Sequence, residues 1–267
     1  MKKIVILTHE FDDFSRRDYL LNRLSQHWRH FGHDVSVVAG SKRLPDADIA
    51  ILHVDLSVVP DTYLRALEKY PRVLNGRVAD IRKRAISRNL LSQRHRWNGA
   101  VVVKTDLNHA GIPERLMARR SGAAGASNAP CPGDEPYSIL SSIRAVNRQV
   151  WVDPTKVVER FLPERDHRGY WLRAWVFLGN AERCTRYLSR TPIVKGSAIL
   201  DREPVEVPKA LRAERRRLGF DYGKFDFVLH EGKPVLFDAN RTPAGAPPGP
   251  GVDEANLRLA MGIDSFF

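Results

Sequence analysis

Residues 224–240 read KFDFVLHEGKPVLFDAN, two apolar runs of alternating pattern on either side of a short turn that contains glycine. This pattern predicts a β-hairpin. If Val228 pairs with Leu236 across the turn, Asp226 lies directly opposite Asp238. The hairpin then carries two carboxylates side by side on one face.

The same alternation divides the other side chains of the hairpin between its two faces. Asn240 joins the two acids, and four apolar side chains point the opposite way, into a core: Phe225, Phe227, Val235 and Phe237. Facing carboxylates destabilise a hairpin unless a hard cation such as Mg²⁺ lies among their oxygens. A register slip of one residue would separate the acids, and an exposed polar face on an edge hairpin is the alternative explanation.

The hairpin resembles the metal-binding end of the ATP-grasp ligases, in which an Asp-containing strand and a turn precede an acid-x-Asn-x-x-Pro strand. Asp226, Asp238, Asn240 and Pro243 match this pattern, with Asp238 where the family usually has Glu. The resemblance implies that Asp226, Asp238 and Asn240 bind Mg²⁺, with Mn²⁺ as an alternative metal. It also implies that Lys224 lies beside the phosphates and acts in catalysis.

The composition is that of a basic globular protein. The 267 residues are enough for a sizeable core, and 43 Lys and Arg against 31 Asp and Glu give a formal charge of +12. Such a surplus attracts polyanions, for example nucleotide phosphates or acidic peptides. The basic runs at 94–96, 119–120 and 215–217 lack the aromatic interleaving of nucleic-acid-binding motifs, so solvated faces are the simplest interpretation and we do not expect nucleic acid as a partner. A further hypothesis is that the runs at 94–96 and 215–217 attract an anionic acceptor.

Cysteine usage and the apolar runs bear on the cellular compartment. Cys131 and Cys184 lack metal-ligand spacing, so we expect free thiols in a reducing environment. The first ten residues become polar too early for a signal peptide, and no run approaches the roughly 20 apolar residues of a membrane span. These features predict a soluble, cytoplasmic protein without a membrane partner.

Residues 1–75 predict a small α/β lobe with a largely parallel sheet, because apolar runs alternate with segments of helical spacing. The expected strands are 4–7, 34–39, 49–54 and 72–74, and the expected helices are 19–31 and 61–70, with Asp61 as a cap. The loop at 9–13 follows the first strand, where open α/β sheets bind ligands; a solvated acidic turn is the alternative.

Residues 76–267 predict the larger part of an α/β (α+β) fold. The expected helices are 78–93, 139–147, 209–218 and 253–261, and the expected strands are 100–103, 157–163, 171–177 and 182–189. Residues 119–134, rich in Gly, Ala, Ser, Asn and Pro, predict a mobile loop. By the resemblance, residues 76–267 form an ATP-grasp domain of two α+β subdomains, of which about 100–162 covers the nucleotide.

Lys104 ends an apolar strand beside a glycine-containing loop, a position that suits either contact with phosphate oxygens or simple surface exposure. In the family, a Val-Val-Lys-Pro strand before such a loop supplies a lysine that binds the nucleotide. Residues 102–105 match it, with Thr in place of Pro. A second lysine normally comes earlier in the chain; Lys83 is the candidate and Arg88 competes for the role.

Residues 157–164, VVERFLPE, resemble the adenine-binding hinge of the family. A strand that breaks at proline leaves backbone N–H and C=O groups free to pair with a purine edge, here around Phe161 and Leu162. The resemblance places Glu159 at the adenine amino group and Glu164 at the ribose hydroxyls. A strand end with two solvated acids is the structural alternative.

Two further strands carry candidate arginines. Arg173 faces the same way as Trp171 and Trp175, and it either stacks on the indoles or reaches the triphosphate. The family often has a phosphate-contacting arginine on this strand, which favours the second role. The resemblance also implies an arginine over the transferred phosphate, and either Arg186 or Arg190 matches it. The choice depends on which face of the strand each side chain takes. Arg190 is our candidate catalytic residue.

The resemblance implies an ADP-forming carboxylate–amine ligase that uses ATP and Mg²⁺ to activate a carboxylate as an acyl phosphate and couples it to an amine or a similar nucleophile. Cations are needed to bring a carboxylate to a triphosphate. The expected acceptor is an anionic small-molecule or peptide carboxylate, and a homodimer is left open. The alternatives are a kinase on the same fold, a nucleotide-binding protein without turnover, and a sugar transferase, for whose second nucleotide-binding lobe the chain is too short.

Overall fold

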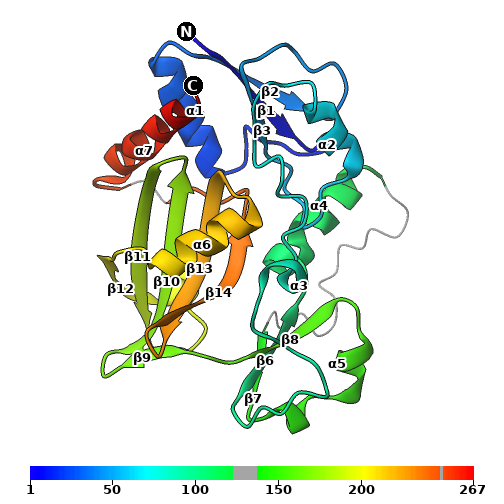
Figure 1. Cartoon of the computed structure of the whole chain (residues 1–267), viewed down its shortest axis with the longest axis vertical. Coiled ribbons are helices and arrows are strands. Elements are labelled where there is room, and N and C mark those ends of the chain that lie inside the picture. Colours follow the sequence, from blue (N-terminus) through cyan, green and yellow to red (C-terminus); the bar gives the residue numbers. More distant parts are fainter. Residues whose placement is uncertain (123–136, 247–248) are drawn as a thin grey trace.

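The computed structural model describes residues 1–122, 137–246 and 249–267, and these form three β-sheets arranged along the long axis of the molecule (Figure 1). The expected class, a parallel α/β lobe followed by α+β layers, is confirmed. Most of the loop predicted at 119–134, including Cys131, lies outside the described residues. Cys184 is a buried free thiol.

The N-terminal sheet is parallel, with strand order β2-β1-β3-β4. Its elements are β1 (Lys3–Thr8), α1 (Leu20–His30), β2 (Asp34–Ala39), β3 (Ile49–Leu52), α2 (Asp61–Leu67) and β4 (Val73–Leu74). Ile4 and Ile6 share a core with α1, whereas Val5 and Leu7 share a core with α2. The two helices therefore cover opposite faces of this sheet, as side-chain alternation along β1 requires.

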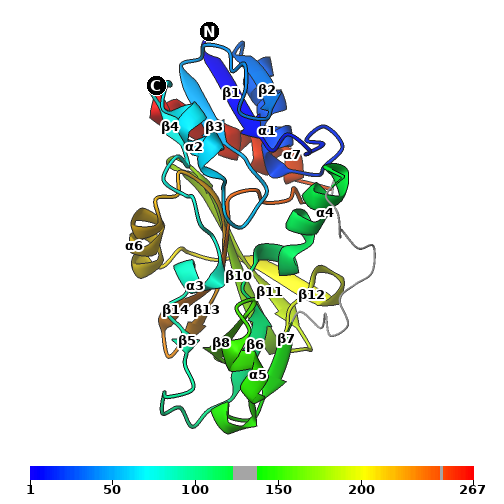
Figure 2. The same ribbon diagram turned by 90° about the vertical axis from the view of Figure 1, so that its right-hand side faces the viewer.

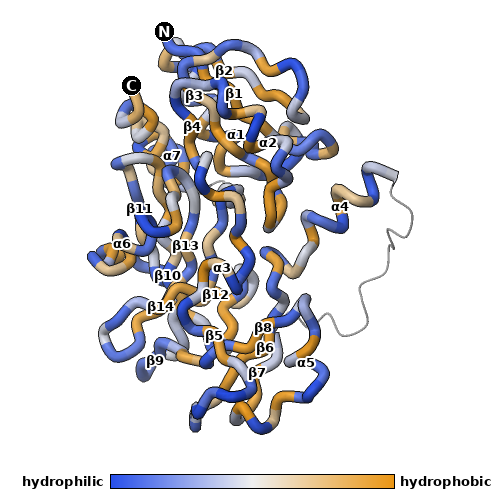
Figure 3. The backbone as a smooth tube through the Cα atoms, turned by 45° about the vertical axis from the view of Figure 1, so that its right-hand side comes forward, coloured by the Kyte–Doolittle hydropathy of each residue, from blue (hydrophilic) through white to orange (hydrophobic). Residues whose placement is uncertain are grey.

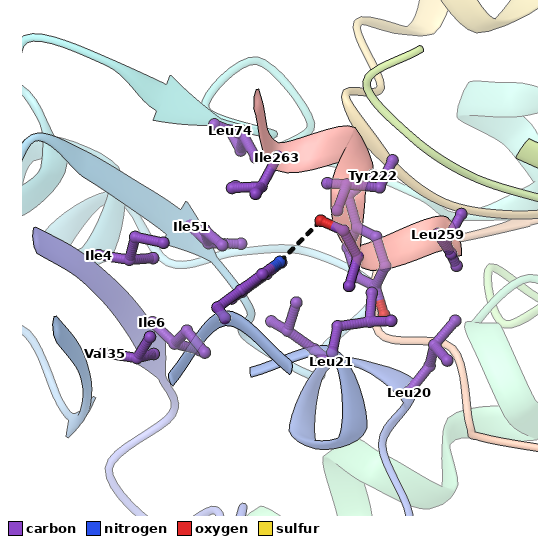
Figure 4. Close-up of a cluster of buried hydrophobic side chains, with 14 of the residues drawn as sticks. Ile4, Ile6, Leu20, Leu21, Val35, Ile51, Leu74, Tyr222, Leu259 and Ile263 are labelled. Atoms are coloured by element: carbon purple, nitrogen blue, oxygen red, sulfur yellow. Dashed lines mark hydrogen bonds between the residues drawn. The ribbon is translucent and has the colours of Figure 1, made fainter. Parts of the chain in front are cut away.

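The C-terminal elements complete the core beside α1. Helix α7 (Val252–Ala260) and a 3₁₀ turn (Met261–Phe266) bring Leu259 and Ile263 against the N-terminal sheet. Trp28 of α1 donates from Nε1 to the Ala260 carbonyl at 2.9 Å. Figure 4 shows side chains from both ends of the chain gathered around this contact.

The central sheet is antiparallel, with order β12-β11-β10-β13-β14 and β9 paired to β10. Its elements are β9 (Glu164–Asp166), β10 (Gly169–Leu178), β11 (Ala181–Ser189), a 3₁₀ turn (Gly196–Ala198), β12 (Ile199–Pro204), α6 (Lys209–Leu218), β13 (Tyr222–His230) and β14 (Lys233–Asn240). Leu211 of α6 packs with Trp175, Phe225 and Phe227. Helix α6 thus covers the aromatic face of the sheet (Figures 1 and 2).

A smaller antiparallel sheet, with order β5-β8-β6-β7, lies at the other end of the molecule from the N-terminal sheet (Figure 2). Its region comprises α3 (Lys83–Ile86), β5 (Leu90–Leu91), β6 (Val101–Thr105), a 3₁₀ turn (Asn108–Gly111), α4 (Ile112–Arg120), β7 (Tyr137–Leu140), a second turn (Ile143–Ala145), α5 (Arg148–Val152) and β8 (Lys156–Arg160). Hydrophobic residues concentrate in its strands β6 and β8 (Figure 3). They form a small core of their own.

The helix predicted at 78–93 is wrong over most of its length, because its backbone bonds to other segments. The amide of Ile81 donates to the Ser57 carbonyl, and the amide of Lys83 donates to the Asp106 carbonyl. Only α3 is helical, and β5 follows it. Tertiary hydrogen bonds override the helical spacing here.

The helix predicted at 139–147 is also wrong. Ile139 belongs to β7 and pairs with Val102, and a short 3₁₀ turn follows. The boundary of α2 differs in detail, since Asp61 is the first helical residue and Pro60 holds the cap position. The remaining predicted strands and helices occur within a few residues of their expected bounds.

Candidate nucleotide and metal site

The turn of the β13–β14 hairpin sets a register that differs from the predicted one. Glu231 and Gly232 form a two-residue turn with φ values of 50° and 76°. Positive φ at both positions fits the twist of the flanking strands, and it favours glycine. Val228 consequently pairs with Val235 and not with Leu236.

A β-bulge at Phe237 restores the predicted contact between the acids. The pairing shifts by one residue there, so that Asp226 lies opposite Asp238. The bulge also changes which side chains of β14 face the core. Leu236 is buried with the aromatic cluster, whereas Val235 and Phe237, which we predicted in the core, are not part of that cluster. Phe237 lines the candidate site instead.

Each of the two aspartates has a lysine partner. Asp226 Oδ2 lies 2.9 Å from Lys224 Nζ, and Asp238 Oδ1 lies 2.7 Å from Lys83 Nζ. Burial raises the pKa of Asp226, and the charge of Asp238 adds to this effect. Burial alone would also raise the pKa of Asp238, but the charges of Lys83 and Lys104 outweigh it and lower that pKa. Asp238 is therefore the more firmly ionised member of the pair.

The oxygen atoms around the aspartates fit a hard divalent cation. Asp226 Oδ1 is buried and has no hydrogen-bond partner within the described ranges. Asn240 follows on the same face of β14 but does not line the cavity, and its Oδ1 accepts from the Thr242 amide at 2.8 Å and from the Thr242 hydroxyl at 3.2 Å, contacts that a bound cation would have to replace. The described residues contain no cluster of three or more His, Cys, Asp or Glu suited to a metal, so a site here depends on the amide as a third ligand. Carboxylate and amide oxygens suit Mg²⁺ and Mn²⁺.

Lys104 points into the same region from β6. Its Nζ lies 2.7 Å from Glu159 Oε2 and 3.1 Å from the Phe237 carbonyl. Glu159 is fully buried, so its carboxylate is an obligatory partner of this cation. The bulge at Phe237 thereby positions a lysine of the small sheet over the central sheet.

These side chains line one cavity of about 180 Å³, to which both sheets contribute. Seven of the predicted site residues line it: Lys83, Lys104, Glu159, Phe161, Glu164, Asp226 and Asp238. Lys224 reaches it through its ion pair with Asp226. Leu162 is buried next to Phe161 and does not line the cavity.

Arg173 forms an ion pair that bears on its predicted role. This arginine is 8% exposed, and its Nε and Nη2 donate to the Glu164 carboxylate at 2.8 and 2.7 Å. Arg173 pairs with Phe227 in the sheet, so it lies on the face opposite to Asp226. Glu164 also accepts from the Leu229 amide at 2.8 Å. The geometry argues against contact of Arg173 with phosphates near Asp226, and it leaves Glu164 without a free oxygen for a ribose.

The end of β11 at Ser189 separates the two candidate arginines. Arg186 pairs with Arg173 across the strands, lies 2.6 Å from Glu203, and stacks 4.2 Å from the Trp171 ring. It therefore belongs to the face that Arg173 occupies. Arg190 lies in the exposed loop after β11 and forms no ion pair with a described residue, so it stays the candidate.

Sequence reasoning missed His109 as a neighbour of this site. His109 and Ala110 adopt left-handed φ values of 44° and 54°, which are uncommon without glycine. His109 Nε2 lies 3.3 Å from Asn240 Nδ2. The only available signal was the short His-Ala-Gly run that stands where the family has a glycine-rich loop. Strained backbone at such a position is typical of functional sites.

Solved structures share this architecture across the whole chain. A RimK domain ATP-grasp protein from Sphaerobacter thermophilus aligns over 98% of this chain and 99% of its own, with a TM-score of 0.55 and 16% identity. The ATP-grasp ligase PsnB, solved with a minimal precursor, Mg and ADP, aligns over 99% of this chain and 97% of its own, with a TM-score of 0.56 and 13% identity. The D-alanine–D-alanine ligase from Bacillus anthracis, complexed with ATP, aligns over 100% of this chain and 96% of its own, with a TM-score of 0.52 and 13% identity.

The chain therefore has the ATP-grasp fold, with a lysine-rich cavity and paired acids between two of its sheets. No protein-family model matches the sequence, and no curated protein is significantly similar to it. The described residues contain no helix that is both long and apolar enough to cross a bilayer.

Proposed function

We propose that this chain is an ATP- and Mg²⁺-dependent ligase that activates a carboxylate as an acyl phosphate and couples it to an amine or a similar nucleophile. The observation that carries the proposal is the convergence of Asp226 and Asp238 with Lys83 and Lys104 in one cavity. The fold neighbours solved with ATP, or with Mg and ADP, support a nucleotide in this position.

In this proposal the acidic residues bind the cation and the lysines bind the phosphates. Asp226, Asp238 and Asn240 would hold the cation, which would supply positive charge against the negative charge of the reacting phosphates. Lys83 and Lys224 would exchange their carboxylate partners for phosphate oxygens, adding charge-assisted contacts. Lys104 would stay paired with the buried Glu159 and turn its remaining N–H donor toward the phosphates. The backbone around Phe161, which lines the cavity, would pair with the purine edge.

The acceptor in this proposal is an anionic carboxylate, in keeping with the formal charge of +12. The cluster 215–217 does not serve the cavity, because α6 packs on the aromatic face of the central sheet and Asp226 lies on the other face. The cluster 94–96 is left as the candidate for attracting the acceptor.

Asp226→Asn is the sharpest single test, because it removes the charge beside the unpartnered Oδ1. Its lysine partner, Lys224, is 33% exposed, so the variant should fold. We expect Mg²⁺-dependent ADP release to fall roughly 100-fold or more, the scale of losing a group that stabilises transition-state charge. Asp201→Asn, at an exposed ion pair with Arg168, is the matched control and should keep wild-type rates.

The products distinguish the reaction classes. With a panel of carboxylates, trapping by hydroxylamine should give a hydroxamate together with ADP and phosphate, which indicates an acyl phosphate; AMP and pyrophosphate would indicate an acyl adenylate. A stable phosphoester would instead indicate a kinase. Nucleotide binding without ADP release under any condition would indicate a protein that has lost turnover. Wild-type ADP release by Asp226→Asn would contradict the assignment of the metal site.

A further inference from the structure

A second cavity, of about 570 Å³, opens where α6 meets the segment after β4. Four arginines line it: Arg77, Arg212, Arg215 and Arg216. Asp221 is the one acidic side chain among the described residues of its lining. We call this feature, defined by these residues, the arginine cavity.

Arg215 is held rigidly at the wall of the arginine cavity. Its Nε and Nη2 donate to the carbonyls of Phe220 and Asp221, each at 2.9 Å, and its guanidinium stacks 4.1 Å from the Phe177 ring. Burial lowers the pKa of Arg215 to about 10, and the neighbouring charge of Arg212 contributes in the same direction. An anion beside this guanidinium would reduce the cost of burying its charge.

Arg77 and Arg216 supply charge that the protein does not neutralise. Both are exposed, and neither forms an ion pair with a carboxylate in the described ranges. Gly219 ends α6 in a left-handed conformation, φ 73°, and its missing Cβ would stand 3.1 Å from Arg77 Cβ. Arg77 can therefore lie across the end of α6. The attraction of a helix C-terminus for cations explains basic residues in the last turn of α6 itself. It does not by itself explain Arg77, which belongs to the segment after β4.

The charges around the cavity do not balance. Arg212 is bound by both oxygens of Glu182, and Asp221 Oδ2 accepts from the Asn75 amide at 2.8 Å. Two carboxylates thus face four guanidinium groups, which leaves an excess of two positive charges. That excess matches a dianion.

The arginine cavity is distinct from the nucleotide site. The two cavities share no lining residue. Trp175 lines the arginine cavity and pairs with Phe225, whereas Asp226 faces the opposite side of the sheet. A ligand could therefore occupy each cavity at the same time.

We propose that the arginine cavity binds the dianionic phosphate group of a small ligand. Planar guanidinium forks match phosphate oxygens in pairs, and arginines from α6 and from the segment after β4 line the same cavity. Bound phosphate would join Arg77 to α6 and so strengthen the contact between the N-terminal lobe and the central sheet. Inorganic phosphate and a phosphomonoester present the same dianion.

Calorimetric titration of the full chain in 0.15 M salt with inorganic phosphate, and separately with glycerol phosphate, tests this site. We expect saturable binding of one equivalent, which Arg77→Gln and Arg216→Gln each weaken about tenfold, as expected for losing one charge-assisted contact. Arg217→Gln is the matched control, because Arg217 is the next residue on α6 and pairs with Glu214. It should leave the affinity unchanged.

The variant Lys224→Ala, at the nucleotide site, shows which of the two cavities binds the phosphate. It should keep the wild-type affinity for phosphate. Tighter binding of glycerol phosphate than of phosphate would indicate an ester as the ligand, and equal affinity would indicate the free ion. Three results would overturn the proposal: no saturable binding, equal weakening by Arg216→Gln and Arg217→Gln, or loss of binding in Lys224→Ala. Tighter binding of malonate would overturn the preference for phosphate.

Discussion

The imidazole of His53 is a buried titratable group. His53 follows β3, is fully buried, and neither ring nitrogen has a partner among the described residues. Tyr19 and Phe14 contact it edge-on, at ring-centroid distances of 4.6 and 5.3 Å. Burial lowers the pKa of His53 to about 3; the charge of Asp55 opposes this shift and that of Arg241 adds to it. The side chain is therefore neutral in the folded protein.

This residue should make stability depend on pH. Its pKa in the folded state lies below the ordinary 6.5, so its contribution is fully present above pH 6.5 and is lost as the pH falls toward 3. Between pH 7 and 4.5 the loss should be roughly 2–3 kcal/mol. Urea unfolding at both pH values should show that His53→Phe loses roughly 2–3 kcal/mol less unfolding free energy between pH 7 and 4.5 than wild type does. His167→Phe, at an exposed position, should lose as much as wild type. Parallel pH profiles of His53→Phe and wild type would refute the argument.

The candidate site shows which residues can be predicted from sequence. Asp226 and Asp238 could be placed together because strand alternation fixes their shared face, and Lys104 could be placed because it ends an apolar strand. The role of Arg173 could not, because its partner Glu164 comes from a three-residue strand without a sequence pattern of its own. The position of His109 depends on its backbone conformation, which its residue type does not favour.

At the scale of elements, the sequence predicts strands well where apolar alternation is long, and poorly where tertiary bonds decide. The strands β10 and β11 and the helix α6 lie close to their predicted bounds. The bulge in β14 leaves no mark in the alternation of its residues, so the pairing near the turn was predicted incorrectly. Short strands such as β12 are mostly exposed and lack an apolar pattern to signal them.

The segment after β14 connects the central sheet to the N-terminal lobe through one side chain. Arg241 is fully buried, and its guanidinium donates to the carbonyls of Val54, Leu56 and Val78. Burial lowers the pKa of Arg241 to about 10. The loop after β3 and the loop after β4 are therefore both attached to the end of β14.

Arg241→Met should destabilise the protein by about 3 kcal/mol, because it keeps the apolar volume but leaves the carbonyls of Leu56 and Val78 without a donor among the described residues. The Val54 carbonyl loses one donor and keeps the Leu56 amide at 2.9 Å. The control is Arg258→Met, which removes an exposed i,i+4 ion pair with Glu254 and should cost less than about 1 kcal/mol. Urea unfolding measures both. Equal losses in the two variants would show that the carbonyls find other partners.

At the scale of the whole molecule, the cores of the lobes are shared. Val176 of β10 and Tyr222 of β13 belong to the same buried cluster as Ile4 of β1 and Ile263 near the C-terminus (Figure 4). The expected division of the chain at residue 75 follows the order of the elements, while this cluster crosses it. The N-terminal lobe and the central sheet should accordingly unfold together.

Leu259→Ala tests this coupling. Leu259 is 2% exposed in the shared cluster, and truncating it should cost about 2–5 kcal/mol through the cavity that it leaves. Leu257→Ala, at a residue of α7 that is 37% exposed, is the control and should cost much less. Hydrogen exchange should show that Leu259→Ala weakens protection of β1 and β13 alike. Loss of protection confined to α7 would mean that the lobes unfold separately.

The packing of α7 on α1 also has a consequence for how the protein is made. Ala260, which accepts the Trp28 bond, is translated 232 residues after it. A nascent chain on the ribosome can form β1 to β4 early, but one side of α1 then has no native covering until α7 has been synthesised. Throughout that interval the Trp28 indole lacks its Ala260 partner, and α1 lacks the apolar contacts with Leu259 and Ile263. We therefore expect chaperones that bind apolar surface to contact the nascent chain at α1 and to leave when α7 emerges.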